Sequence, residues 1–180
     1  MADVDAAVQF VLRQEDSRLS GAVTTLPGDS GGPTRFGLAS TRHPELVAQQ
    51  YYEVVEGVPV VPHEVALPIA EAAYTTQYAA PVQLAAVTNQ DIANRILSFS
   101  INEGPGTATE VLQRALNSLG NTLTIDGGFG SKTLAAVNAA DPEMLLAAER
   151  TFEEQYYDQL VIKEPALAPY IKGLLARADA

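Results

Sequence analysis

Glu15 is the side chain whose position in the sequence first indicates acid chemistry. It follows Val11 by four positions and Val8 by seven, so in a helix it projects from the same face as these apolar residues. A carboxyl group on such a face loses water, which raises its pKa and leaves it able to donate a proton near neutral pH. A glycoside hydrolase builds this environment for its general acid. In the structural alternative, Glu15 ends the helix and turns to solvent or pairs with Arg13 or Arg18.

A second polar group is expected from the segment that follows. Residues 17–40 are rich in Gly, Pro, Ser, Thr and Asp, which predicts a glycine-rich hairpin. A sugar hydrolase of the lysozyme type needs a polar group across the cleft from its acid, and Asp29 and Thr34 are the candidates. In an inverting mechanism this group positions or deprotonates a water, and the two carboxyl groups stand about 6.5–9.5 Å apart. Asp29 before Ser-Gly-Gly is equally typical of a turn residue.

The spacing of apolar residues predicts a mainly helical protein with a small β-hairpin element after the first helix. Asp3 is the expected cap of that first helix, Thr107 and Glu110 have the spacing of a capping box, and Asp141 precedes a long helix. Helices are expected over residues 4–15, 64–78, 89–102, 107–119, from 131, from 142, and over 169–178.

Composition excludes several classes of function. The chain has 11 basic and 22 acidic side chains, a net charge of -11 and no cysteine. The acidic charge argues against a nucleic-acid partner and against docking on an anionic membrane, and the lack of Cys excludes disulfides and Cys nucleophiles. His43 and His63 have no partner at ligand spacing, so we expect no metal and no cofactor.

The sequence also carries an expectation about location. No apolar run approaches the roughly 20 residues that a bilayer crossing needs, so we expect no membrane insertion. The opening Met-Ala-Asp-Val-Asp is acidic where a signal peptide is basic. We therefore expect synthesis in the cytoplasm without a signal peptide.

Several blocks of the chain resemble one enzyme family. Residues 11–38, with Glu15 followed by PGDSGGPTRFGL at 27–38, look like the start of the glycoside hydrolase family 108 N-acetylmuramidases, in which a Glu precedes Asp-Pro-Gly-Gly-x-Thr-x-x-Gly-Ile. Tyr74 and Tyr78 match a Tyr-x-x-x-Tyr block of the family. Later blocks resemble a predicted peptidoglycan-binding domain of the third type: SINEGPG at 100–106, LQRALN at 112–117, DGGFG at 126–130 and KTL at 132–134.

This resemblance implies a lysozyme-like α+β fold and hydrolysis of the β-1,4 bond between N-acetylmuramic acid and N-acetylglucosamine in peptidoglycan. By match, Glu15 is the general acid and Thr34 helps to hold the water, while Asp29 lies near the family's aspartate. Residues 1–98 would form the catalytic part and residues 99–180 the peptidoglycan-binding part, packed as one globular unit. The implied substrate-binding residues are Tyr74, Tyr78 and Asn102.

The resemblance leaves a second hypothesis open, a lysozyme-fold protein that is catalytically weak or inactive and binds peptidoglycan or a protein partner. Family members read Glu-Gly-Gly-Tyr at the acid, where this chain has Glu-Asp-Ser-Arg at 15–18, and the chain has no Trp. Peptidoglycan is anionic, so an acidic chain needs short-range contacts or a local positive patch. The candidates for such a patch are Arg35, Arg42, Arg95 and Arg114.

The expected partner is the glycan strand of peptidoglycan, with a protein partner as the alternative under the second hypothesis, and we expect a monomer. Action in the periplasm or at the cell wall would require release through a holin, a dedicated transporter or lysis.

Overall fold

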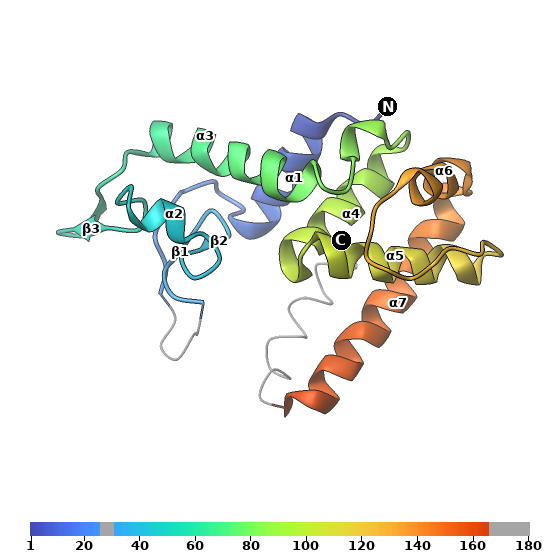
Figure 1. The fold of residues 1–180 in the computed structure, drawn as a ribbon. Coiled ribbons are helices and arrows are strands. Elements are labelled where there is room, and N and C mark those ends of the chain that lie inside the picture. Colours follow the sequence, from blue (N-terminus) through green and yellow to red (C-terminus); the bar gives the residue numbers. More distant parts are fainter. Residues whose placement is uncertain (26–30, 166–180) are drawn as a thin grey trace. The chain divides into compact units, whose positions relative to one another are not determined.

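The computed structural model describes residues 1–25 and 31–165. The chain forms two compact units, one made of Val8–Thr75 and the other of Met1–Ala7 with Thr76–Ala180. Helices dominate the described residues, and the strands form two short antiparallel hairpins (Figure 1). The predicted mainly α fold with a hairpin after the first helix is confirmed. The predicted boundary between residues 98 and 99 falls inside helix α4 (Gln90–Glu103), so the division of function between 1–98 and 99–180 stays a prediction.

Helix α1 spans Val4–Glu15, as its apolar spacing predicts. Asp3 caps its first turn, because the Asp3 carboxylate accepts a 3.0 Å hydrogen bond from the amide of Ala6. Val8, Val11 and Leu12 form the buried stripe of the helix. The stripe fixes the rotation of α1 and therefore the direction in which Glu15 leaves its last turn.

The first hairpin pairs β1 (Thr34–Arg35) with β2 (Leu38–Ala39), with Thr34 opposite Ala39 and Arg35 opposite Leu38 (Figure 1). Phe36 and Gly37 connect the strands with φ of 49° and 78°, the positive pair of a type I′ turn. On its other side Thr34 exchanges two 2.8 Å backbone hydrogen bonds with Thr24. The predicted hairpin is present: the antiparallel Thr24–Thr34 pair flanks the glycine-rich residues, and the β1–β2 turn follows them.

The rest of the smaller unit contains a short helix, a second hairpin and a longer helix. Helix α2 spans Pro44–Val47, and β3 (Val54–Val55) pairs with β4 (Val58–Pro59). Helix α3 spans His63–Ala73 and continues as a π-helical segment, η1, over Tyr74–Ala79. The helix predicted over 64–78 is therefore two segments. Single π-helical turns are frequent at functional sites, and this one begins at Tyr74.

The larger unit packs around three helices, α4 (Gln90–Glu103), α5 (Pro105–Ser118) and α7 (Pro142–Lys163) (Figure 1). The 3₁₀ turn η2 (Leu84–Ala86) precedes α4, and α6 (Ser131–Ala139) lies between α5 and α7 in the chain. The centre of this core is aromatic and aliphatic, and apolar side chains of α7 cover it. Its members are Phe99, Ala108, Val111 and Tyr157, with Phe152, Tyr156, Leu160 and Val161 packed against them.

The sequence predicts the starts of α4 and α7 correctly, whereas α6 begins at Ser131 itself, with Gly130 and not Ser131 as its N-cap. Asn89 caps α4 and Asp141 caps α7, each accepting a 3.0 Å hydrogen bond from a backbone amide of the first turn. The capping box expected at Thr107 is wrong, because α5 already begins at Pro105, a residue suited to the first helical position. The helix predicted over 169–178 lies outside the described residues. Among the helices that the structure describes, none combines the length and the apolar character of a bilayer crossing.

Candidate functional site

Glu15 is the last residue of α1 and its side chain is half-buried. The hairpin turn lies directly against the stem of this side chain. A Cβ atom on Gly37 would stand 2.7 Å from Cγ of Glu15, closer than real Cβ contacts come, and 3.0 Å from its Cβ, which is tighter than most such contacts. Only glycine therefore lets the turn approach α1 this closely, and the approach restricts where the carboxyl group of Glu15 can go.

Tyr74 completes the contact between the turn and Glu15. Its hydroxyl donates a 2.7 Å hydrogen bond to the carbonyl oxygen of Phe36, the residue before Gly37. The same Cβ on Gly37 would overlap the hydroxyl oxygen of Tyr74. Three segments that are distant in sequence thus meet at one point: the end of α1, the β1–β2 turn and the start of η1.

The turn is held from its other side by the ring of Phe36. This ring is buried, lies edge-on to the ring of His63 at 5.5 Å between centroids, and fills the space next to Gly21. Nε2 of His63 donates a 2.7 Å hydrogen bond to the carbonyl oxygen of Leu19. His63 therefore connects the segment after α1 with the hairpin, a structural contact that its position in the sequence did not indicate.

Asp16, the second carboxylate beside Glu15, is used within its own loop. Its carboxylate accepts hydrogen bonds from the Ser20 hydroxyl at 2.9 Å and from the Gly21 amide at 2.8 Å. Burial on its own would raise the pKa of Asp16, but these hydrogen bonds outweigh it and lower that pKa. Asp16 therefore stays ionised and shapes the segment that leads from α1 to the hairpin.

Arg35 is an internal support of the hairpin that the sequence did not reveal. Its side chain is 1% exposed, and it donates hydrogen bonds to the carbonyl oxygens of Gly21 at 2.7 Å and Tyr51 at 3.2 Å. Its guanidinium lies 5.2 Å from the centre of the Tyr51 ring. Burial lowers the pKa of Arg35 and raises the pKa of Tyr51 to about 12. Arg35 is thus unavailable for the positive surface patch expected from the sequence.

The other predicted site residues have different surroundings. Thr34 is half-buried in β1, two positions before the turn, and its hydroxyl lies 3.5 Å from the carbonyl oxygen of Gly32. Asp29 lies outside the described residues. The ring of Tyr74 is fully buried, so its visible role is to position the turn. Tyr78, 8% exposed, and the half-buried Asn102 belong to the larger unit. Their roles in binding stay predictions.

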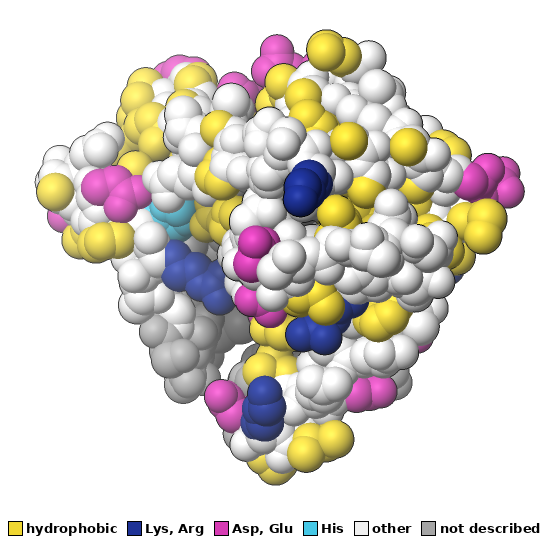
Figure 2. All heavy atoms as spheres, turned by 45° about the vertical axis from the view of Figure 1, so that its right-hand side comes forward, with side chains coloured by type: hydrophobic (Ala, Val, Ile, Leu, Met, Phe, Trp, Pro, Cys, Tyr) yellow, Lys and Arg dark blue, Asp and Glu magenta, His cyan; other side chains and the backbone are white. Residues whose placement is uncertain are grey.

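Charged side chains are dispersed on the face of the molecule drawn in Figure 2, where acidic (magenta) and basic (dark blue) groups alternate with hydrophobic ones. The basic groups on this face stand apart from one another. This face therefore offers no broad positive surface, and an anionic ligand bound on it would depend on local contacts.

Comparison with known proteins finds a matching family model and similar solved structures. Residues 107–179 match the model of a family described as a predicted peptidoglycan domain. The fold is similar to that of SagA from Brucella abortus, with a TM-score of 0.68 and 22% sequence identity over 97% of this chain and 90% of SagA. No curated protein sequence matches the chain.

Proposed function

We propose that this protein is a muramidase that hydrolyses the β-1,4 bond between N-acetylmuramic acid and N-acetylglucosamine in peptidoglycan, with Glu15 as general acid. The observation that carries the proposal is the half-buried position of Glu15 at the end of α1, with the β1–β2 turn packed on its stem through Gly37. A general acid must be held in one place beside the leaving oxygen, and this packing restricts the carboxyl group. The peptidoglycan family match over 107–179 supports the substrate.

In this mechanism each residue has a separate task. Glu15 protonates the leaving glycosidic oxygen as the bond breaks. The hydroxyl of Thr34 helps to hold the attacking water, and Asp29 is the candidate to activate it. Tyr74 is a positioning residue, because its hydroxyl donates a hydrogen bond to the carbonyl oxygen of Phe36 and so holds the turn that packs on Glu15.

A second function is favoured by other observations: binding of peptidoglycan or of a protein partner without cleavage. The chain has no Trp to form a sugar platform, and Ser17 and Arg18 stand where the family has smaller or aromatic residues. The peptidoglycan family match also does not depend on Glu15, since it covers only residues 107–179. A binding protein would retain affinity for the wall whatever residue stood at position 15.

The decisive experiment compares the parent protein with Glu15→Gln on purified peptidoglycan, measuring the release of new reducing ends. Glu64→Gln is the matched control, because Glu64 is an exposed carboxylate in the same unit. Loss of a general acid slows the reaction about 100- to 10,000-fold. We expect this loss for Glu15→Gln and parent activity for Glu64→Gln.

Sedimentation with intact sacculi separates the two functions. If neither the parent nor Glu15→Gln releases reducing ends, but both proteins sediment with the sacculi, the protein binds peptidoglycan without hydrolysing it. Parent-level cleavage by Glu15→Gln would remove Glu15 from the mechanism. We further propose that the protein acts as a monomer at the cell wall after release by a holin, a transporter or lysis. Gel filtration of the purified chain tests the oligomeric state.

A further inference from the structure

A groove runs between α5 and α7 in the larger unit, within the segment that matches the peptidoglycan family. Its volume is about 360 Å³. From α5 it is lined by Thr107, Glu110, Val111 and Arg114, which recur at intervals of three or four and so form one stripe of the helix. The lining residues belong to the larger unit, and none of them takes part in the contacts described around Glu15.

Aromatic side chains of α7 form one wall of the groove. Phe152 and Tyr156 are four residues apart, so their partly buried rings follow each other along the helix. The Tyr156 hydroxyl donates a 2.9 Å hydrogen bond to the carboxylate of Glu103, and its ring lies edge-on to Phe99 at 5.7 Å. Tyr156 is therefore fixed before any ligand arrives, and a fixed aromatic face is a surface on which the C–H groups of a sugar ring can stack.

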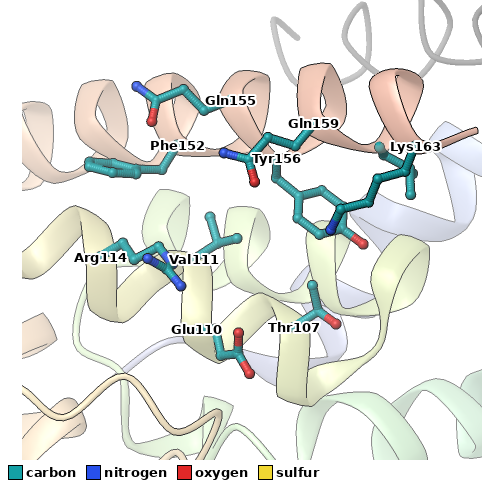
Figure 3. Close-up of a pocket in the computed structure, with 10 residues that line it drawn as sticks. Thr107, Glu110, Val111, Arg114, Phe152, Gln155, Tyr156, Gln159 and Lys163 are labelled. Carbon is teal, nitrogen blue, oxygen red and sulfur yellow. The ribbon is translucent and has the colours of Figure 1, made fainter.

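Amide groups stand beside these rings. Gln155 and Gln159 are exposed on α7, and their side-chain amides form no hydrogen bond with any described residue. In Figure 3 the Gln159 amide points from α7 toward α5, while Val111 points from α5 toward α7. A primary amide offers both a donor and an acceptor, which is what an acetamido group requires.

The charges of the groove have the opposite sign to the net charge of the chain. Arg114 and Lys163 line the groove with one carboxylate, that of Glu110. Neither cation forms an ion pair with another residue in the described part of the chain. Two of the 11 basic side chains of an acidic protein thus line one small groove, and among residues 1–25 and 31–165 neither has an ion-pair partner. Such cations are suited to bind an anionic group of a ligand.

We infer that the α5–α7 groove binds an N-acetylated amino sugar that carries a carboxylate, of the kind that N-acetylmuramic acid provides in a glycan strand where it carries no stem peptide. The sugar ring stacks on the aromatic wall, and the glutamine amides form hydrogen bonds with the acetamido group. Arg114 and Lys163 bind the carboxylate. The inference rests on the proposed action on peptidoglycan, and it adds a holding site at a distance in sequence from Glu15. The charge of the groove favours this occupant over a neutral chitin-type sugar.

The test titrates the full-length Glu15→Gln chain, which leaves the sugar intact, with three probes while the side-chain amide signals of Gln155 and Gln159 are followed by NMR. The probes are N-acetylglucosaminyl-N-acetylmuramic acid, chitobiose, and the stem tetrapeptide alone. We expect the muramyl disaccharide to shift these signals and to bind more tightly than chitobiose. Shifts with the tetrapeptide and not the disaccharide would overturn the assignment to a sugar carboxylate.

Variants in the same background test the contacts. Arg114→Gln with Lys163→Gln should weaken the muramyl disaccharide about 10- to 100-fold and leave chitobiose nearly unchanged. Lys132→Gln, exposed on α6 outside the groove, is the charge-matched control and should bind as the parent does. Phe152→Ala should weaken both sugars. Unchanged affinity in the double variant, or no shift with any sugar, overturns the inference.

The outcome is independent of catalysis. If the groove binds the disaccharide but the parent releases no reducing ends, only the muramidase proposal is contradicted. If the parent releases reducing ends but the amide signals of Gln155 and Gln159 do not shift, only the groove site is contradicted.

Discussion

The hydroxyl of Tyr74 donates a 2.7 Å hydrogen bond to the carbonyl oxygen of Phe36, 38 residues earlier in the chain. Both residues are buried, so neither group can exchange this bond for one to water. The bond ties the start of η1 to the turn that packs on Glu15. The position of the candidate acid therefore depends on an interaction that does not involve the acid itself.

Tyr74→Phe should destabilise the smaller unit by about 1–3 kcal/mol, because it leaves the buried carbonyl of Phe36 without its donor. Local hydrogen exchange should rise at residues 36–38, measured by mass spectrometry beside urea unfolding. Tyr51→Phe is a matched control, since it removes a 3.2 Å bond to the carbonyl of Ala66 away from the turn. An equal rise in exchange at 36–38 in both variants would show that the Tyr74 bond has no specific effect on the turn.

Gly37→Ala should be more harmful than the same change in the second hairpin. At φ of 78° an alanine is strained, and its Cβ would collide with Glu15 and Tyr74, so we expect a loss of about 2–4 kcal/mol in unfolding free energy. Gly57 has a similar φ of 81° but nothing within 4 Å of its Cβ position, so Gly57→Ala should cost only about 1 kcal/mol. Equal losses would mean that the turn does not press on Glu15. Of these two variants, only Gly37→Ala should lose the proposed muramidase activity.

Arg35→Lys tests the internal support of the hairpin. Lysine keeps the charge but cannot reach both carbonyl oxygens that the guanidinium bonds, those of Gly21 and Tyr51. Loss of one such hydrogen bond to a charged group costs about 1.5–3 kcal/mol, which urea unfolding measures. Arg42→Lys, at an exposed position, should change stability by less than about 0.5 kcal/mol. If Arg35→Lys were as stable as the parent, the hydrogen bonds of the Arg35 guanidinium would not be what stabilises the hairpin.

The helices were largely predictable because their signals are local. The apolar stripe and Asp3 fix α1 at Val4–Glu15, and Asp141 fixes the start of α7. The turn of the first hairpin was not predictable, because Gly31 and Gly32 resemble a turn and Phe36 at a φ of 49° does not. Phe36 tolerates that backbone since its ring is buried beside Gly21 and His63, a long-range contact that no local pattern contains.

The site was predictable only in its first residue. The apolar stripe of α1 indicates the direction of Glu15, whereas the contacts that hold it come from Gly37 and Tyr74, 22 and 59 positions later. The burial of Arg35 could not be predicted from the sequence either, since arginine side chains are mostly exposed. The Thr-x-x-Gly spacing that ends at Gly37 was the one sequence signal for the turn. The interpretation of that spacing required the fold.

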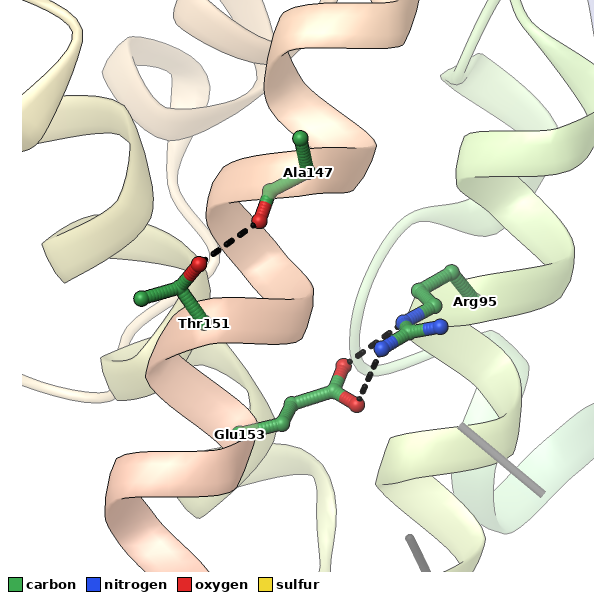
Figure 4. A network of polar contacts seen from close by, with 4 residues as sticks. All are labelled: Arg95, Ala147, Thr151 and Glu153. Carbon is green, nitrogen blue, oxygen red and sulfur yellow. Dashed lines mark hydrogen bonds and ion pairs between the residues drawn. The ribbon is translucent and has the colours of Figure 1, made fainter. Parts of the chain in front are cut away.

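Arg95, also expected in a surface patch, is instead part of a buried charge cluster in the larger unit. It donates two hydrogen bonds to the carboxylate of Glu153 on α7, at 3.0 and 2.8 Å (Figure 4). Glu149, one turn earlier on α7, is 3% exposed, and one of its carboxyl oxygens has no hydrogen-bond partner in the described part of the chain. Two buried acids thus share one arginine, which favours a proton on one of them.

The pKa values of this cluster set the sign of a pH effect on stability. Burial raises the pKa of Glu153 from 4.5 to about 7, although Arg95 opposes the shift. Burial, followed by the charge of Glu153, raises the pKa of Glu149 well above 4.5. The folded state therefore holds protons that the unfolded state has released above pH ~4.5, so stability must fall as pH rises from there. For Glu153 the fall ends near pH 7, and for Glu149 it continues while that group ionises.

Glu149→Gln should remove its share of this dependence, because an amide of the same shape carries no charge at any of these pH values. We expect the variant to match the parent at pH 5 and to exceed its unfolding free energy at pH 8 by about 1–3 kcal/mol. Urea unfolding at pH 5, 6, 7 and 8 measures both curves. Asp158→Asn, an exposed change on the same helix, should leave the slope of the parent unchanged. Each proton that the folded state holds above pH ~4.5 must lower the unfolding free energy as pH rises. If the parent were equally stable at pH 5 and pH 8, the buried cluster would therefore not be retaining protons.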